Sequence, residues 1–238
     1  MYENPIVVLL NSKENVVSFL KYVETLAEPH KFVFVSIKSP SETEDDSILT
    51  LGDLISMHIT IMTPAKHEVL GCLNLTDISD TYFKALSELC RFAARDLFSP
   101  STAVKFINYS ALCSIANKYG AEEIFVGEIY KNTCVANNEE IVSAVRTAAS
   151  NKGFTVLMPY YGNSDIDIDA ELGQFLLSYG SEELNSFRED RMIEHCSVED
   201  KAGLNELIAY LTSFFDFCYE TYSTKLIELT EKEEKVDE

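Results

Sequence analysis

The chain is poor in positive charge. Its 238 residues include 19 lysines and arginines against 39 aspartates and glutamates, which gives a formal net charge of −20. Such a surface repels phosphate backbones over most of its area, so free nucleic acid is not expected as a partner. A protein partner, or a second copy of the chain in a homodimer, is expected instead.

Close pairs of cysteine are absent as well. Zinc sites usually show C-x-x-C pairs, and neither the cysteines nor the four histidines have that spacing. Wide spacing and apolar surroundings are typical of reduced thiols in a core. The sequence therefore predicts no structural metal. The six cysteines are Cys72, Cys90, Cys113, Cys134, Cys196 and Cys218.

Long apolar runs are also missing. No run approaches the roughly 20 residues that a membrane-spanning helix requires, and the first residues do not resemble a signal peptide. We therefore expect a cytoplasmic protein outside the membrane. A chain of this length can bury a substantial core without disulfides or metals. The acidic stretches 41–46 and 231–238 are expected to be a solvated loop and a solvated tail.

Short apolar runs alternate with amphipathic segments along most of the chain. This order predicts an α/β fold, a doubly wound and mainly parallel sheet with a helical C-terminal region. We expect an α/β domain over residues 1–180 and a helical extension with an acidic tail over 181–238. Strands are predicted at 5–10, 31–37, around 57–62, 122–127 and 154–161, and helices at 14–27, 80–98, 103–120, 137–153, 168–178 and 203–232.

The loop after the first predicted strand has no glycine. It reads Asn-Ser-Lys-Glu-Asn over residues 11–15, between a buried strand and a helix. Ligands of parallel α/β sheets bind at the carboxyl ends of the strands, and a helix N-terminus favours anions. The predicted positions of a degenerate nucleotide site are therefore Asn11, Ser12, Lys13, Asn15 and, after a later strand, Gly127.

The layout of residues 5–180 resembles the QueC family of PP-loop synthases. The resemblance rests on the strand-loop-helix start, on "LFSPSTAVKFINYSALCSIANKYGAEEIFVGEIY", and on "FTVLMPYYGNSDIDIDAELGQFLLSYG". It implies a PP-loop fold and an ATP-dependent enzyme that converts a carboxylated deazaguanine into its nitrile, on the path to queuosine. The family also forms dimers.

The motifs of that family are altered here. Its S-G-G-x-D-S loop corresponds to residues 11–16, where both glycines, the aspartate and the final serine are replaced. Its F-V-P-G-R-N segment corresponds to residues 98–103, where Thr102 stands for the arginine. Its Y-P-D-C-R patch corresponds to "CVANN" at 134–138, and its K-A-E-I motif to "DIDAEL", which leaves Glu171 as a remnant. Only Cys196 and Cys218 lie where the family has four zinc-binding cysteines.

Three other patterns allow functional interpretations. Asp165, Asp167 and Asp169 alternate as in a calcium loop but lack its glycine and distal glutamate, so an acidic helix start is favoured. Adjacent His195 and Cys196 point in different directions and do not predict a catalytic dyad. Aromatic residues of the last helix cover more than one face, which favours self-association slightly over simple core packing. The predicted interface residues are Tyr210, Phe214 and Phe217.

The sequence thus favours a pseudoenzyme: a catalytically degenerate QueC-like protein that serves as a scaffold for a protein partner, in a virus such as a phage that inherited the fold. No cofactor is expected. The alternatives are an active deazapurine synthase with a rebuilt ATP and magnesium site, and a small-nucleotide sensor or sponge. For the rebuilt site the sequence offers Lys13, Lys105, Lys131 and Arg146 as phosphate ligands.

Overall fold

The computed structural model describes residues 4–37, 54–59, 67–75, 100–129, 135–163, 165–179 and 201–234. The elements in chain order are β1 (Ile6–Leu9), α1 (Lys13–Thr25), β2 (His30–Ile37), β3 (His67–Leu75), α4 (Pro100–Lys118), β4 (Glu123–Phe125), a 3-10 turn η2 (Val135–Asn137), α5 (Glu139–Asn151), β5 (Thr155–Leu157), α6 (Ile168–Ser178) and α7 (Lys201–Glu234).

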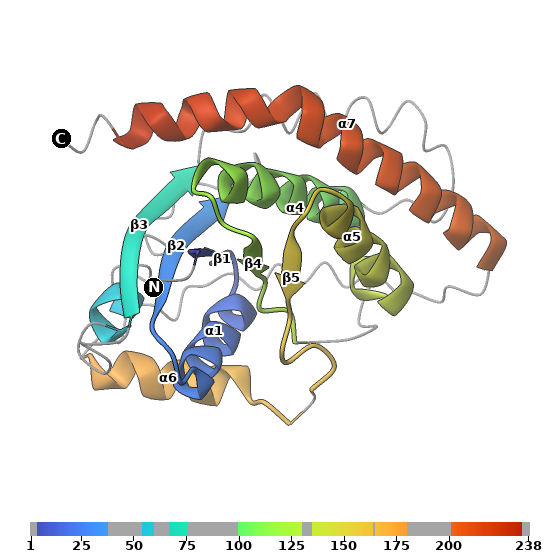
Figure 1. Ribbon diagram of the computed structural model, residues 1–238. Coiled ribbons are helices and arrows are strands. Elements are labelled where there is room, and N and C mark those ends of the chain that lie inside the picture. The colour runs from blue at the N-terminus through green and yellow to red at the C-terminus, as the bar shows by residue number, and fades with distance from the viewer. Residues whose placement is uncertain are drawn as a thin grey trace.

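The strands form one parallel sheet in the order β3-β2-β1-β4-β5 (Figure 1). The chain starts in the centre, builds outward through β2 and β3, and then crosses back to place β4 on the other side of β1. The strand order therefore reverses between β1 and β4. In open α/β sheets this switch point is where ligands bind, at the carboxyl ends of the strands.

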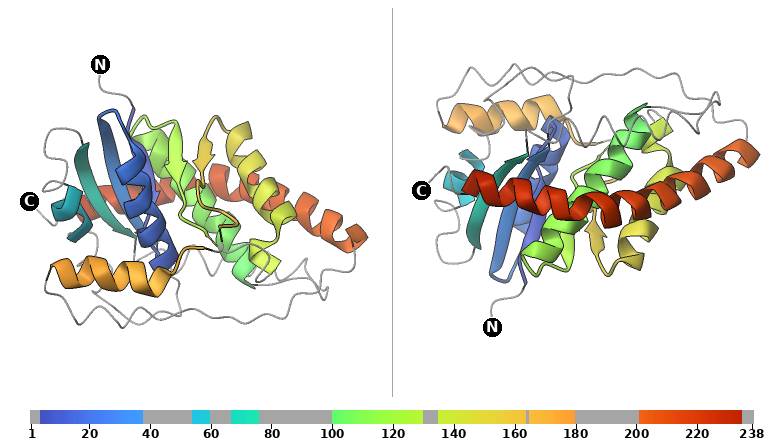
Figure 2. Two further views of the ribbon diagram at one scale, coloured as in Figure 1. Left: turned by 90° about the horizontal axis from the view of Figure 1, so that it is seen from below. Right: turned by 90° about the horizontal axis from the view of Figure 1, so that it is seen from above.

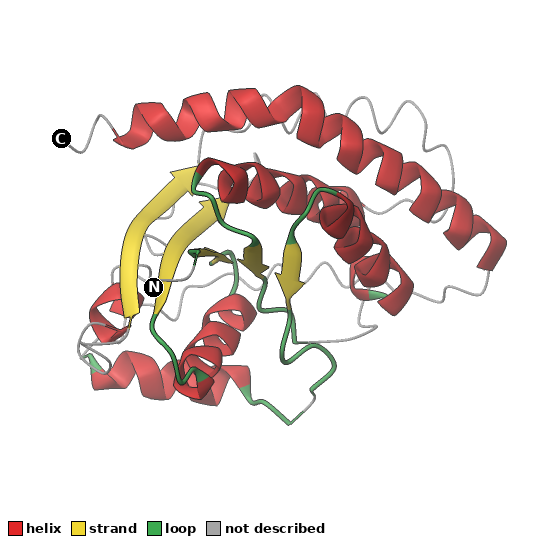
Figure 3. Cartoon of the chain, viewed as in Figure 1, coloured by secondary structure: helices red, strands yellow, loops and turns green. Residues whose placement is uncertain are grey.

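Two apolar layers cover the sheet, one on each face. Alternate residues of β1 divide between them: Val7 and Leu9 pack with α4, α5 and α7, while Ile6 and Val8 pack with α1 and α6. All four side chains are buried, as expected of a parallel strand covered on both faces. Figure 3 shows the strands between the two groups of helices. The predicted fold class, a doubly wound α/β sheet, is confirmed.

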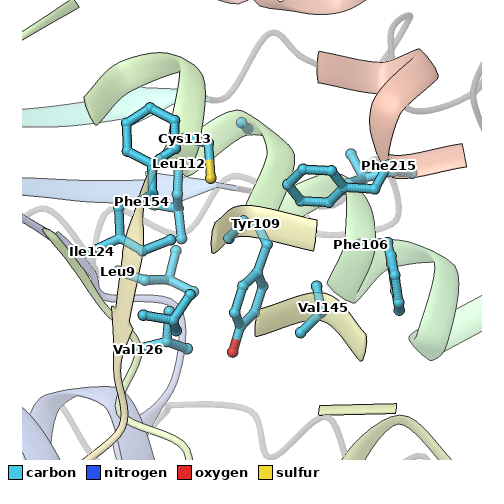
Figure 4. Packing of buried hydrophobic residues seen from close by; sticks show 14 of the residues in the cluster. Leu9, Phe106, Tyr109, Leu112, Cys113, Ile124, Val126, Val145, Phe154 and Phe215 are labelled. Carbon is cyan, nitrogen blue, oxygen red and sulfur yellow. The ribbon is translucent and has the colours of Figure 1, made fainter. Parts of the chain in front are cut away.

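Helix α7 is the outermost layer on one side. Seen from above in Figure 2, it crosses α4 and reaches over the sheet. Phe215 and Leu211 are fully buried in the same core as the strands. Figure 4 shows Phe215 beside Tyr109 of α4, close to Val145 of α5. Over the described ranges, no helix is both long and apolar enough to cross a membrane.

The helix predictions are accurate where they can be compared. Helix α6 has the predicted bounds, and Asn138 caps α5 by accepting a hydrogen bond from the Glu140 backbone N–H at 2.9 Å. Gly120, at φ 65°, adopts the left-handed conformation expected after α4. The predicted helix at 80–98 and the acidic loop at 41–46 lie outside the described residues.

The strand predictions are less accurate. The strand expected around 57–62 is wrong in its first part, because residues 54–59 form a short helix that buries Ile55 and Ile59, four positions apart. The edge strand β3 was not predicted at all. Strands β4 and β5 end at Phe125 and Leu157, earlier than predicted, because the chain turns into loops at the carboxyl edge of the sheet.

Candidate functional site

The predicted loop lies at the switch point of the sheet. Residues 11–15 leave the carboxyl end of β1 and enter α1, while Gly127 follows the end of the neighbouring strand β4. The structure thus brings the loop and Gly127 together, although they are more than a hundred positions apart in the sequence. The candidate site is the junction of these two strand ends, where Gly127 lies against Asn15.

Asn11 is held by backbone bonds to the neighbouring strand. Its Nδ2 donates to the Ile37 carbonyl at 2.7 Å, and its Oδ1 accepts from the Ile37 N–H at 2.7 Å. Its own N–H donates to Oδ1 of Asn15 at 3.1 Å. The two asparagine side chains therefore close the loop on itself and extend the pairing of β1 with β2.

Ser12 and Lys13 are also engaged in local contacts. Ser12 is the N-cap of α1, and its Oγ accepts from the Asn15 N–H at 3.2 Å. Lys13 Nζ lies 2.9 Å from a carboxylate oxygen of Asp169 in α6. The positive charge that could meet an anion at the helix N-terminus is paired with a carboxylate instead.

Glu14, in the first turn of α1, connects α1 to the chain that follows β4. Its Oε2 accepts a hydrogen bond from the Ile129 N–H at 3.1 Å, so a carboxylate of the first loop binds the backbone that follows β4. The sequence places Glu14 in the loop but does not predict this partner, which lies 115 positions away.

Gly127 allows the two chain segments to touch. A Cβ atom at this position would lie 2.6 Å from Asn15 Cα and 2.7 Å from the Asn15 carbonyl oxygen, both of which are backbone atoms. Real carbon atoms do not approach so closely, so only glycine fits. The space that a glycine leaves beside the loop is filled here by the first turn of α1.

A second group of polar side chains begins at Glu128, which directly follows Gly127. We call this group the Lys105 cluster, and its members are Lys105, Tyr109, Glu128, Asn137 and Tyr161. Lys105 Nζ lies 2.6 Å from Glu128 Oε2 and 2.9 Å from Asn137 Oδ1. Tyr109 donates to Glu128 Oε1 at 3.2 Å, and Tyr161 donates to the Asn137 carbonyl at 2.8 Å. Lys105 therefore links α4 to two positions of the chain between β4 and α5, Glu128 shortly after β4 and Asn137 just before α5.

Burial shapes the chemistry of this cluster. The side chains of Lys105 and Glu128 are 7% and 14% exposed, so the ion pair is largely removed from water. Burial, followed by the neighbouring Glu128 carboxylate, raises the pKa of Tyr109 well above its usual value. Tyr109 is therefore a neutral donor at physiological pH. The sequence offers Lys105 as a phosphate ligand under the enzyme alternative. The pattern of an isolated lysine in an apolar helix does not predict its partners Glu128 and Asn137.

The predicted acidic helix start is borne out at α6. Asp167 is the N-cap, with its Oδ1 accepting from the Ala170 N–H at 3.1 Å, and Asp169 pairs with Lys13. Glu171, the expected remnant of a family motif, pairs with Lys21 of α1 at 2.5 Å. The ion pairs of Asp169 and Glu171 therefore connect α6 to α1. Within the described part of the chain, no three histidine, cysteine or acidic side chains converge as metal ligands.

The remaining predicted positions are dispersed. Phe214 is buried in the core, Tyr210 packs against that core, and Phe217 is 43% exposed on α7. Phe214 thus serves packing within the chain, while self-association through Phe217 stays a prediction. Cys113 and Cys218 are free and buried, as predicted for core thiols. His195 and Cys196 lie outside the described residues.

Comparison with known proteins agrees on the fold. No family model and no curated protein matches the sequence. Among solved structures, the chain is similar to a 4-thiouridine synthetase in complex with RNA and with bound ATP, at 11% identity and a TM-score of 0.58. The alignment covers 92% of this chain and 53% of the synthetase, so the chain spans about half the length of that enzyme.

Two other structures are similar at lower scores. An NMN synthetase from Francisella tularensis gives 13% identity and a TM-score of 0.42, over 94% of this chain and 87% of that enzyme. A U34-tRNA thiolase from Methanococcus maripaludis, with its [4Fe-4S] cluster, gives 8% identity and a TM-score of 0.41. That alignment covers 98% of this chain and 73% of the thiolase. The likeness to the 4-thiouridine synthetase shows the fold alone, a parallel α/β sheet covered by helices on both faces. That this is a PP-loop fold stays a prediction. The narrower resemblance to the QueC family stays a prediction.

Proposed function

We propose that this chain is a scaffold that binds a protein partner through a PP-loop fold whose nucleotide crevice is closed by its own side chains. The hydrogen bond from the Ile129 N–H to Glu14 Oε2, at 3.1 Å, carries the proposal. It places a carboxylate of the chain at the switch point, where a ligand anion of such a sheet would otherwise receive backbone donors.

Charge strengthens this closure. A phosphate that came within 4 Å of the Glu14 carboxylate would be repelled by about 4 kcal/mol per pair of unit charges at an effective dielectric constant of about 20. Lys13 could offset that repulsion only by leaving Asp169, which lies 2.9 Å from its Nζ. An anion therefore competes with two contacts that the chain already makes.

The enzyme alternative would need other phosphate ligands. Lys105 pairs with Glu128 and Asn137 in a buried setting, so its charge is already neutralised. Arg146 is exposed on α5, and Lys131 lies outside the described residues. A rebuilt ATP site, or a nucleotide sensor, that used Lys13 or Lys105 would have to displace an existing ion pair, which supports the scaffold.

The proposal includes a lineage. We infer descent from a QueC-like synthase, on the layout of residues 5–180 and the altered motifs, with a virus as the carrier of the gene. The retained fold would then offer a stable surface to a protein partner after loss of the chemistry. The strongly acidic composition suits a partner with a basic face.

Calorimetric titration with magnesium and ATP tests the proposal. We expect no binding heat from the wild type at millimolar ATP, and a dissociation constant in the micromolar range would overturn the scaffold. Glu14→Gln keeps an acceptor for Ile129 but removes the charge, so it tests whether repulsion contributes to exclusion. Glu24→Gln, at an exposed position of the same helix, is the matched control.

An assay of catalytic turnover distinguishes the enzyme alternative from the scaffold. Mass spectrometry would follow conversion of the carboxylated deazaguanine to its nitrile in the presence of ATP and ammonia. We expect no product above the background of a reaction without protein. Product formation at a steady rate would favour the synthase with a rebuilt site.

A further inference from the structure

Helices α5 and α7 enclose a groove on the side of the sheet opposite α1 and α6. It has a volume of about 450 Å³ and is open to solvent. Both walls are helical, and the two helices pack against each other along it. The lining residues are Glu139, Glu140, Ser143, Ala144, Thr147, Ile208 and Thr212.

The surface at the floor of the groove is mainly apolar. Thr147 donates its hydroxyl hydrogen to the Ser143 carbonyl at 2.8 Å, and Thr212 donates to the Ile208 carbonyl at 2.9 Å. Neither threonine therefore has a hydrogen left to donate to an occupant. Together with the partly buried Ala144 and Ile208, they form a surface of short, mostly apolar side chains.

Acidic side chains lie at both ends of the groove. At one end Glu139 and Glu140 are exposed on the first turn of α5. Toward the other end Lys152 lies 3.0 Å from Asp216 and 3.3 Å from Glu220, so these three side chains leave one negative charge uncompensated. An occupant must therefore bring apolar side chains for the floor and positive charge for the ends.

We propose that this groove binds an amphipathic helix of a partner protein, with lysine or arginine over Glu139 and Glu140. The inference rests on the scaffold function proposed above and names the surface and the chemistry of its partner. Helices recognise grooves of this kind by placing one apolar face between two receptor helices. A small molecule needs about 70–90% of its surface buried, which an open groove between two helices does not provide.

Fluorescence anisotropy tests the inference with a labelled synthetic helix as the probe. The probe is about five turns long, with leucine on one face and lysine elsewhere, and its counterpart replaces every lysine with glutamate. We expect the wild type to bind the lysine peptide and not the glutamate peptide. Glu139→Lys with Glu140→Lys, and separately Thr147→Tyr at an exposed floor position, should each weaken binding at least tenfold.

The control variant carries the same change of charge elsewhere. Glu28→Lys with Glu122→Lys alters two exposed glutamates that do not line the groove, and we expect binding within threefold of the wild type. Equal loss in both charge variants would overturn the inference, because attraction would then be diffuse. Absence of binding by the lysine peptide would also overturn it.

Another outcome assigns the groove to a different occupant. A wild-type dimer in analytical ultracentrifugation that Thr147→Tyr converts to a monomer would identify a second copy of the chain and overturn the inference. Circular dichroism confirms that each variant is folded. Titration with ATP in the same preparations keeps failure of the groove distinct from failure of the scaffold, since nucleotide binding would contradict only the latter.

Discussion

Gly127 shows how one residue can decide whether a crevice is open or filled. It lies directly against the Asn15 backbone, with no room for a side chain between the two segments. In a phosphate-binding loop a glycine commonly admits the ligand close to the backbone. Here the same small residue admits the first turn of α1, so the contact is between protein and protein.

Gly127→Ala should therefore be strongly destabilising. The added Cβ would meet Asn15 backbone atoms at 2.6 and 2.7 Å, and backbone cannot move aside as a side chain can. We expect a loss of about 1–3 kcal/mol of unfolding free energy, measured by urea denaturation.

Gly173→Ala is the matched control for that substitution. Gly173 lies inside α6, and a Cβ added there would meet no heavy atom within 4 Å. Alanine should therefore add helix stability of roughly 0.5–1 kcal/mol. Equal behaviour of the two variants would contradict the close contact at Gly127.

The loop itself could be located from the sequence, whereas its contacts could not. A buried strand followed by a capped helix predicts the position of residues 11–15 with Asn11 or Ser12 as the cap, and the structure shows that the cap is Ser12. The partners that close the loop are Ile37, Ile129 and Asp169, which come from three distant segments. Local pattern carries no information on such long-range pairs.

Among the elements, α4 depends on a buried ion pair for its attachment to the chain between β4 and α5. Lys105 Nζ binds Glu128 at 2.6 Å and Asn137 at 2.9 Å, the first before and the second after positions 130–134 of the chain. A buried pair is sensitive to loss of one partner, because the other charge is left unpaired in a poorly solvated place.

Lys105→Met should therefore cost about 3–5 kcal/mol of unfolding free energy, and Lys105→Met with Glu128→Gln should recover much of that loss. Urea denaturation of the two single variants and the double variant gives the coupling. Lys152→Met is the control, because its partners Asp216 and Glu220 are 48% and 70% exposed and the expected loss is under about 1 kcal/mol. Additive losses at Lys105 and Glu128 would contradict the pairing.

The strands show why some elements escape prediction from sequence. β3 contains Gly71 and an irregular register, in which Val69 pairs with Phe32 and Gly71 with Val33. Leu70 is the extra residue of this bulge and is 41% exposed, so an apolar residue occupies an exposed position of the strand and obscures its sequence pattern. The helices were easier, because their apolar spacing persists over three or more turns.

At the scale of the whole molecule, α7 belongs to the same core as the sheet. Cys218 and Phe215 of α7 are buried together with Cys113 of α4 and with Val7 of β1. A helix held by shared core residues should unfold with the sheet and not before it. The predicted division at residue 180 stays a prediction, and the unfolding of α7 relative to the sheet tests it.

Burial of the two thiols provides the measurement. Burial raises the pKa of Cys218 to about 12, and it raises the pKa of Cys113 further, whereas an unfolded cysteine titrates at about 8.5. The neutral thiol is thus favoured in the folded state, so this contribution to stability is complete below about pH 8.5 and is lost as the pH rises toward the folded pKa. Reaction with iodoacetamide requires the thiolate and access to it.

We therefore expect both cysteines to resist iodoacetamide at about pH 8 until the protein unfolds. Labelling in a urea series, read for each cysteine by peptide mass spectrometry, should rise for Cys113 and Cys218 at the same midpoint as the loss of near-ultraviolet circular dichroism from aromatic side chains such as the buried Tyr109. Labelling of Cys218 at lower urea would show that α7 detaches first. The groove between α5 and α7 would then exist only while α7 is docked, so a common midpoint is also what a rigid binding surface requires.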